Sequence, residues 1–253
     1  MGFLKLSINK INDAILHNIN GSYLIQKIYI FFLMAIYMNQ NMFITLEGID
    51  GAGKDIQLLN LIEIIRDDKN GIIADKYANI WVTREPTHLT ESGKKISKLI
   101  REGNVDLETA KNLYVNDRKE HSIIIREMLK HSIVISSRFD ISTLAFQNAQ
   151  GESIEELYKM HGFENNECIT PDLTIFFDVS ADIGYARTLK RAEKKECFEN
   201  LDFLRKVESS YKQVIDFLKN KGRNIIIIDA NQSIEDVKDN MLSKLTKIYK
   251  KYE

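Results

Sequence analysis

The sequence predicts a three-layer α/β fold, in which helices cover both faces of a five-stranded parallel sheet. From residue 42 onward, short apolar segments alternate with longer segments of helical periodicity. The apolar segments lack a strict alternation of polar and apolar residues, which is typical of strands buried on both faces. A glycine-rich loop joins the first apolar segment to the first helical one. Ligands of such folds bind at the carboxyl ends of the strands, so we expect the functional residues there.

The order of elements follows from these patterns. The predicted strands are residues 43–46, 80–83, 132–136, 173–179 and 224–228. Helical periodicity is clearest at residues 56–65, 107–130, 181–191, 201–218 and 237–249. Ser153 and Glu156 have the spacing of a capping box, which predicts a further helix start. No repeat or low-complexity linker interrupts the alternation, so we expect residues 42–253 to form one domain.

Composition excludes several classes of protein. A hydrophobic content of 44% and a charged content of 28% are globular values and argue against disorder. The net charge of −1 argues against a general nucleic-acid or membrane-surface binder. Cys168 and Cys197 are too few for a disulfide framework or a zinc site, so we expect a reduced, cytoplasmic protein.

The first 41 residues differ from the rest of the chain. Residues 28–38 form an apolar run that would be about 16 Å long as a helix, too short to span a bilayer. No small-residue cleavage site of a signal peptide follows it. Met38 and Met42 both precede the first predicted strand. We therefore expect residues 1–41 to be an extension, from a mis-assigned start or an extra helix, rather than a membrane anchor.

The glycine-rich loop has the pattern of a phosphate-binding P-loop. Gly48, Gly53 and Lys54 form its G-x-x-x-x-G-K core, between a predicted strand and a predicted helix. Glycines let the backbone turn tightly, so that N–H groups and the helix N-terminus face phosphate oxygens. Lys54 would reach the β- and γ-phosphates of a nucleotide as a point charge. The alternative is an ordinary turn with a surface lysine.

Further patterns follow the predicted strands and open the predicted helices. They are T-R-E-P at residues 83–86, D-R-x-x-H at 117–121, R-F-x-x-S-x-x-A-F-Q at 138–147, P-D-L-T at 171–174 and F-E at 198–199. Together with the P-loop, their order and spacing make residues 42–251 similar to the thymidylate kinase family. The resemblance implies transfer of the ATP γ-phosphoryl group to dTMP, with Mg²⁺ and a lid that closes over the site. It implies ATP-binding roles for Gly48, Ile49, Asp50, Gly51, Ala52, Gly53, Lys54, Asp55, Ile56 and Arg187.

The resemblance also implies roles for cations around the phosphates. Arg84 matches the arginine on the dTMP phosphate, and Arg138 matches the one that contacts the transferring group. Arg187 matches a residue that stacks on adenine, and Arg191 matches one that closes over the phosphates. With Lys54, Arg138 and Arg191 are the expected catalytic residues; guanidinium groups suit phosphate because their planar fork binds two oxygens. A solvated, charged helix end is the alternative for the predicted lid, residues 191–199.

The nucleoside site has its own expected residues. By resemblance, Tyr114 stacks on thymine, Arg118 hydrogen-bonds a base carbonyl, and Thr143 contacts the base edge. Phe146 packs against the sugar, and the Asp50 carboxylate lies near the 3′-hydroxyl group. The i, i+4 spacing of Tyr114 and Arg118 places both on one helix face. For Tyr114 and Phe146, core packing is the alternative.

Two positions depart from the family pattern. The family usually has Ser or Thr where this chain has Asp55, and Asp where it has Ser137. Each position therefore holds the side-chain type usual at the other. Mg²⁺ requires hard oxygen ligands, whichever element supplies the carboxylate. We therefore hypothesise that Asp55 and Ser137 together supply metal ligands; the alternative is two independent losses and a weakened enzyme.

The resulting functional prediction is a dTMP kinase that takes ATP and dTMP as substrates and binds neither nucleic acid nor a membrane. A related pyrimidine nucleoside monophosphate kinase with a shifted base preference is one alternative, because Tyr114 and Thr143 alone do not exclude dUMP. A nucleotide-binding pseudokinase is another, because of Asp55 and Ser137. Members of the family commonly form homodimers, and the helix predicted at residues 107–130 could provide the contact.

Overall fold

Five parallel strands form one sheet in the order β2-β3-β1-β4-β5. The strands are β1 (Phe43–Glu47), β2 (Ile80–Arg84), β3 (Ile133–Ser137), β4 (Leu173–Asp178) and β5 (Ile225–Asp229). The computed structural model describes residues 41–66, 79–103, 105–191 and 200–250. Leu46 of β1 lies beside Ser137 of β3, and Glu47 lies beside Phe176 of β4. The carboxyl ends of the central strands therefore meet at one edge of the sheet.

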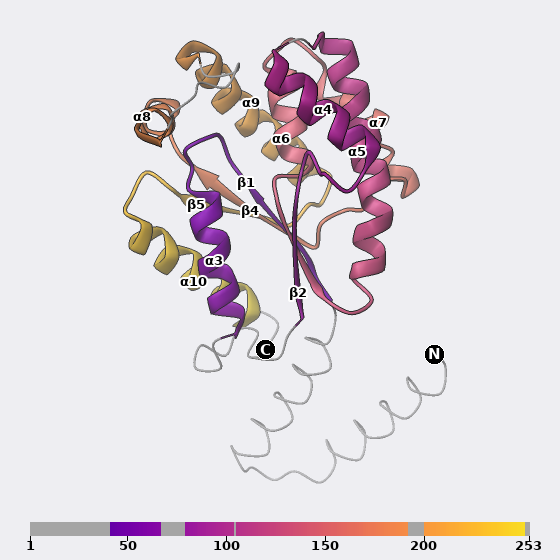
Figure 1. The fold of residues 1–253 in the computed structure, drawn as a ribbon. Coiled ribbons are helices and arrows are strands. Elements are labelled where there is room, and N and C mark those ends of the chain that lie inside the picture. Colours follow the sequence, from indigo (N-terminus) through magenta and orange to yellow (C-terminus); the bar gives the residue numbers. More distant parts are fainter. Residues whose placement is uncertain (1–40, 67–78, 104, 192–199, 251–253) are drawn as a thin grey trace, which may run out of the picture. The chain divides into compact units, whose positions relative to one another are not determined.

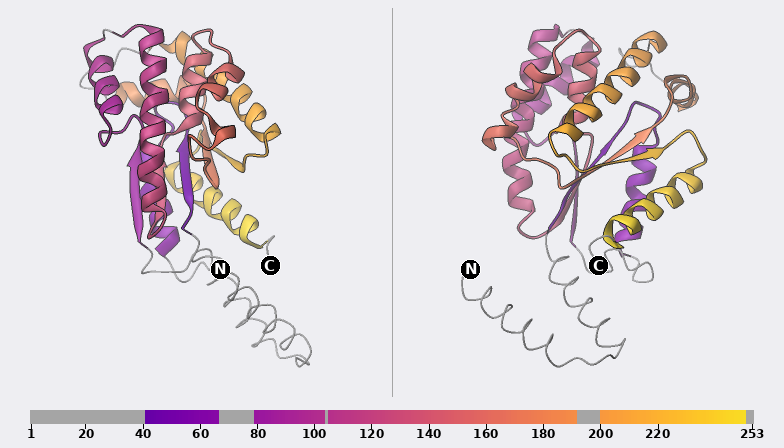
Figure 2. Two further views of the ribbon diagram at one scale, coloured as in Figure 1. Left: turned by 90° about the vertical axis from the view of Figure 1, so that its right-hand side faces the viewer. Right: turned by 180° about the vertical axis from the view of Figure 1, so that it is seen from behind.

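Helices cover both faces of the sheet (Figures 1 and 2). On one face, α3 (Lys54–Arg66) packs against α10 (Ile234–Lys250). The other face carries α5 (Leu107–Met128), α6 (Asp140–Asn148) and α9 (Leu201–Asn220). Outside these, α4 (Glu91–Glu102) packs on α5 and α8 (Ala181–Arg191) packs on α9. A short helix, α7 (Ile154–Met160), and a 3₁₀ turn, η1 (Phe163–Asn165), follow α6.

Side-chain caps explain where several helices begin. The first N–H groups of a helix have no partner within it, so a preceding oxygen stabilises the start. Thr90 accepts the N–H of Gly93 before α4, and Asp106 accepts that of Thr109 before α5. Ser153 accepts the N–H of Glu156 at 3.4 Å, so the predicted helix start at that position is confirmed.

The predicted fold class is confirmed. The first three strands each run one residue further than predicted, to Glu47, Arg84 and Ser137, so that polar side chains stand at the sheet edge. Sequence periodicity did not delimit α4, nor did it delimit α6, which has nine residues and begins three residues after the end of β3. The extension at residues 1–40 and residues 192–199 of the predicted lid lie outside the described residues. Within the described part of the chain, no helix is long and apolar enough to cross a bilayer.

Candidate active site at the carboxyl ends of the strands

The P-loop connects β1 to α3 and wraps tightly. Gly51 and Gly53 have φ angles of 80° and 81°, in the region where only glycine is unstrained. A Cβ atom at Gly51 would lie 2.2 Å from the carbonyl oxygen of Gly184, so the loop tip packs directly on α8. Lys54 folds back over the loop, and its Nζ donates to the carbonyl oxygens of Gly48 and Ile49, both at 2.9 Å. The loop therefore holds Lys54 where the phosphate oxygens of a ligand would replace the backbone carbonyl oxygens as hydrogen-bond acceptors.

Burial, together with the positive charge of Arg138, lowers the pKa of Lys54 to about 7. The carboxylates of Asp50, Glu47 and Asp55 oppose this shift. A nearby anion favours the charged form of an amine. A bound polyphosphate would therefore restore the full charge of Lys54.

Arg138 lies between the P-loop and a neighbouring pocket. Its Nη2 pairs with Asp50 Oδ1 at 2.5 Å, and its Nη1 donates to the Gly48 carbonyl oxygen and to Ser142 Oγ, both at 3.0 Å. Its guanidinium carbon lies 5.6 Å from the centre of the Phe146 ring. One cation thus contacts the phosphate-binding loop and a wall of the pocket at the same time.

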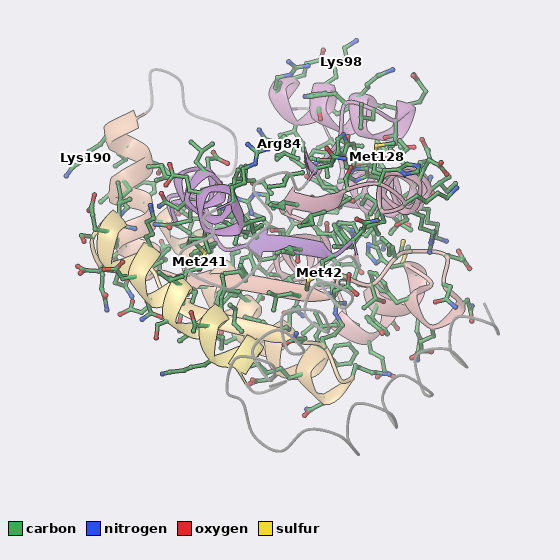
Figure 3. All side chains as sticks on the ribbon, turned by 90° about the horizontal axis from the view of Figure 1, so that it is seen from below. Met42, Arg84, Lys98, Met128, Lys190 and Met241 are labelled. Carbon is green, nitrogen blue, oxygen red and sulfur yellow. The ribbon has the colours of Figure 1, made fainter. Side chains whose placement is uncertain are left out.

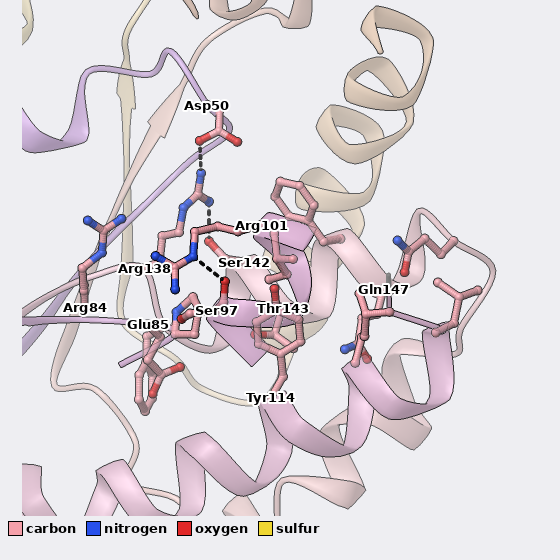
Figure 4. A pocket seen from close by; sticks show the side chains of 18 of the residues that line it. Asp50, Arg84, Glu85, Ser97, Arg101, Tyr114, Arg138, Ser142, Thr143 and Gln147 are labelled. Carbon is pink, nitrogen blue, oxygen red and sulfur yellow. Dashed lines mark hydrogen bonds and ion pairs between the residues drawn. The ribbon is translucent and has the colours of Figure 1, made fainter. Parts of the chain in front are cut away.

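The pocket has a volume of about 380 Å³ and opens beside the strand ends (Figure 4). Asp50, Arg84 and Arg138 gather at one end of it, and Tyr114, Thr143 and Gln147 lie toward the other. The predicted sugar contact, Phe146, also lines it. The Arg84 side chain is exposed and makes no hydrogen bond or ion pair with any described residue. The pocket is therefore charged near the P-loop and mostly uncharged at its far end, as a nucleoside monophosphate requires.

Asp55 and Ser137 face each other at the start of α3 and the end of β3. Ser137 Oγ donates to Asp55 Oδ1 at 3.4 Å, and Ser137 is buried while Asp55 is exposed. Among the described residues, no group of three or more His, Cys, Asp or Glu side chains could hold a metal ion. Two protein oxygens nonetheless fit Mg²⁺, which keeps several waters and takes few protein ligands.

Comparisons with known proteins match the part of the chain that forms this site. A family model described as "Thymidylate kinase" matches residues 46–241. The chain belongs to the thymidylate kinase family. It is 33% identical over 201 residues to the thymidylate kinase of Staphylococcus haemolyticus (strain JCSC1435), covering 77% of this chain and 92% of that protein. It is 32% identical over 207 residues to the probable thymidylate kinase of Methanococcus aeolicus (strain ATCC BAA-1280 / DSM 17508 / OCM 812 / Nankai-3), covering 81% and 96%.

One residue expected from the family pattern does not reach the pocket. Arg118 is fully buried behind Phe139 and Thr143, which do line it. Its Nη2 pairs with Glu85 at 2.5 Å and donates to Thr143 Oγ1 at 2.7 Å. The i, i+4 spacing places Arg118 and Tyr114 on the same side of α5. The Arg118 guanidinium group nevertheless lies in the protein interior, where it pairs with the buried Glu85 carboxylate. In this arrangement Arg118 contacts Thr143, which lines the pocket, and its predicted contact with a base stays a prediction.

Two residues that line the pocket, Gln147 and Arg101, were not assigned to the site by the sequence analysis. Gln147 is 5% exposed, and neither atom of its amide group has a hydrogen-bond partner among the described residues. An unpaired buried amide is costly, so a ligand with a matching donor and acceptor would stabilise it. Arg101 also lines the pocket, and its Nε donates to the Ser97 carbonyl oxygen at 3.2 Å. Gln147 could have been found from the sequence, because it is the last residue of the A-F-Q pattern. Arg101 lies on α4, which the sequence analysis did not delimit.

The predicted adenine contact lies on α8. Arg187 Nη1 donates to the carbonyl oxygens of Ala230 at 2.8 Å and Gly51 at 3.4 Å, so it joins the P-loop tip to the loop after β5. Lys190, near the end of the same helix, points away from the sheet (Figure 3). Arg191 is the last residue of α8, and its side chain lies outside the described part of the structure.

Proposed function

We propose that the protein is a thymidylate kinase that transfers the γ-phosphoryl group of ATP to dTMP, giving dTDP and ADP. Family membership over residues 46–241 supports the activity. The observation that carries the proposal is the position of Arg138, which contacts Gly48 and Asp50 of the P-loop and packs on Phe146 of the pocket. The donor and acceptor phosphates would meet at this guanidinium group.

Phosphoryl transfer needs positioning and charge stabilisation rather than a covalent nucleophile. Lys54 and the P-loop N–H groups would hold the ATP phosphates, Arg84 the dTMP phosphate, and Arg138 the group in transit. Arg191 would close over the phosphates from the lid, and Arg187 would pack against adenine. Each arginine can bind two phosphate oxygens through its planar fork.

The far end of the pocket fits a pyrimidine that offers both a hydrogen-bond donor and an acceptor. Thymine presents an N3–H donor between two carbonyl acceptors, and the unpaired Gln147 amide can match one of each. Thr143 lies at the base edge, held by Arg118 from behind. Tyr114 offers a ring for stacking, and Phe146 one for packing against the deoxyribose.

For the metal, Asp55 and Ser137 would hold Mg²⁺ jointly, and the ion would neutralise phosphate charge when bound. The 3.4 Å contact between the two side chains supports a shared role. Retention of Lys54, Arg84 and Arg138 in the site argues against a pseudokinase, because each lies where a phosphate would bind.

We also propose a cellular location and an oligomeric state for the protein. The buried Cys168 is an unpaired thiol, as expected in the reducing cytoplasm. On α5 the apolar side chain of Ile123 is 68% exposed, and a homodimer formed through this helix would cover it. Light scattering coupled to gel filtration would measure the assembly directly, and a monomer at micromolar concentration would contradict it.

An ADP-release assay with a panel of nucleoside monophosphates tests the function. With ATP and Mg²⁺, dTMP should react faster than dUMP, and faster than dCMP, dGMP or dAMP. Gln147→Leu, which removes both amide partners, should raise the KM for dTMP about tenfold, as expected for one to two lost hydrogen bonds. Equal rates with all monophosphates would contradict thymine recognition, and no turnover with any would favour the pseudokinase.

A further inference from the structure

Glu47, the last residue of β1, is a buried carboxylate that the proposed phosphoryl transfer does not use directly. It is fully buried, and burial raises its pKa to about 7, with a further contribution from the negative charge of Asp140. Its Oε1 accepts the Phe139 N–H at 2.8 Å, and its Oε2 accepts the Ser142 hydroxyl at 2.5 Å. Both partners flank the start of α6, where no side chain of the helix itself provides a cap. Burying a carboxylate is costly, so its position calls for a compensating role.

The backbone at Arg138 needs such support. Its φ angle is 66°, a conformation that residues other than glycine rarely adopt. Three hydrogen bonds hold this turn. The Arg138 N–H donates to the Leu46 carbonyl oxygen at 2.9 Å, and the Arg138 carbonyl oxygen accepts the Ser136 hydroxyl at 2.7 Å. The third is the bond from the Phe139 N–H to Glu47. Glu47 is the one side chain among these partners that also reaches into α6.

The side chain of Arg138 depends on Glu47 as well. Because the single hydroxyl proton of Ser142 goes to Glu47, the Ser142 oxygen presents its lone pairs to Arg138 Nη1 at 3.0 Å. The Tyr211 hydroxyl lies 2.8 Å from the Ser142 oxygen and also accepts a hydrogen bond from Arg138 Nη1 at 3.3 Å. Figure 4 shows the resulting line of contacts from Ser142 through Arg138 to Asp50.

We propose that Glu47 is a positioning residue for Arg138. Through Phe139 it holds the backbone turn, and through Ser142 it orients the guanidinium group between the P-loop and the acceptor pocket. The inference rests on the proposed kinase activity, because phosphoryl transfer is the step for which Arg138 is positioned.

A mutant cycle tests the proposal. Glu47→Gln keeps the size of the side chain but loses its charge and one acceptor, and we expect kcat to fall about tenfold while the KM for ATP changes less than about twofold. Arg138→Ala should be more severe. The double variant should be no slower than Arg138→Ala alone, because residues that act as one unit are non-additive. Multiplicative effects would overturn the proposal.

Two controls separate positioning from general destabilisation. Asp172 Oδ2 accepts the Phe43 N–H at 2.7 Å at the opposite end of β1, so Asp172→Asn disturbs the same strand and should leave kcat unchanged. Ser142→Ala removes the hydroxyl that bonds Glu47, Tyr211 and the guanidinium group but keeps the bond from the Phe139 N–H to Glu47, and it should lower kcat less than Glu47→Gln does. If Glu47→Gln does not fold, a mutant cycle of Ser142→Ala with Arg138→Ala tests whether the contacts that orient the guanidinium group are non-additive with Arg138 itself.

A structural measurement distinguishes this inference from the proposed activity. In a crystal structure of Glu47→Gln, we expect Arg138 to leave its positive φ angle or to lose its pair with Asp50. An Arg138 that keeps both would overturn the positioning role. Wild-type protein that phosphorylates no nucleotide would refute the proposed function, while the crystal structure would still decide the role of Glu47.

Discussion

Lys54 and Arg138 both donate to one oxygen atom, the carbonyl oxygen of Gly48, at 2.9 and 3.0 Å. Two cations at one acceptor repel each other, and this repulsion, together with burial, lowers the pKa of Lys54. A phosphate group would offer both cations a charged acceptor in place of a neutral one. At the scale of the residue, the site is therefore arranged for an anion.

The lowered pKa of Lys54 has a measurable consequence. With a pKa of about 7, most of the Lys54 amine is neutral at pH 8, and bound ATP should return it to the charged form. ATP binding at pH 8 should then take up close to one proton, and ATP affinity should fall as pH rises above 7. Calorimetric titration in two buffers of different ionisation enthalpy measures the uptake. Lys54→Met should show none, and wild-type binding without proton uptake would contradict the prediction.

The pair Asp55 and Ser137 can be tested by exchanging the two side chains. Asp55→Ser removes the one carboxylate of the pair and should reduce turnover severely, because Mg²⁺ loses a charged ligand. Ser137→Asp alone places two carboxylates at one cation and should alter the metal preference. The double variant restores the usual family arrangement and should recover much of the activity, with a coupling of about 0.5–3 kcal/mol.

Mg²⁺ titration of the wild type and the three variants measures this coupling. Thermal melting of the same four proteins, without metal or nucleotide, is the control for folding. Simple addition of the two single effects, with no recovery in the double variant, would show that the two departures from the family pattern are unrelated.

At the scale of the element, α8 and the P-loop form one packed unit. A Cβ atom at Gly184 would lie 2.7 Å from the Asp50 carbonyl oxygen and 2.9 Å from Ile49 Cδ1, so only glycine fits there. The same helix carries Arg187, which bonds the Gly51 carbonyl oxygen at 3.4 Å. The position of the loop tip is therefore tied to the position of the helix that leads to the predicted lid.

Gly184→Ala tests this contact between helix and loop. The added methyl group must push α8 away from the P-loop, an overpacking that costs about 1–3 kcal/mol. We expect a lower melting temperature and a several-fold higher KM for ATP, with little change in the KM for dTMP. Ala186→Ser, at an exposed position of the same helix, is the matched control. An unchanged KM for ATP would show that α8 moves without disturbing the loop.

At the scale of the whole molecule, the described sheet is complete without the first 40 residues. β1 begins at Phe43, whose N–H is bound by Asp172, and the Val134 N–H donates to the Met42 carbonyl oxygen at 2.8 Å. All five strands of the sheet come from residues 43–229. The kinase domain therefore has its central strand anchored by residues within the domain.

Removal of the extension tests whether it is dispensable. A chain that starts at Met38, or at Met42, should fold, melt near the temperature of the full-length protein and keep its kinase activity. Circular dichroism and the ADP-release assay measure both properties. Loss of folding on truncation, or sedimentation of the full-length protein with membranes, would contradict the prediction for residues 1–41.

The sequence by itself determined the sheet, the P-loop and the family, because these depend on local periodicity and on the spacing of short patterns along the chain. Tertiary structure alone decided which side chains reach the pocket. Arg118 has the expected spacing from Tyr114, yet its ion pair with Glu85 holds it behind the residues that line the pocket. Gln147 lines the pocket, and its amide group has no hydrogen-bond partner among the described residues. The pairing of Asp55 with Ser137 was a hypothesis from two departures from the family pattern, and only packing could bring the two side chains within 3.4 Å. Contacts between distant residues depend on how helices seat on the sheet, which no local pattern encodes.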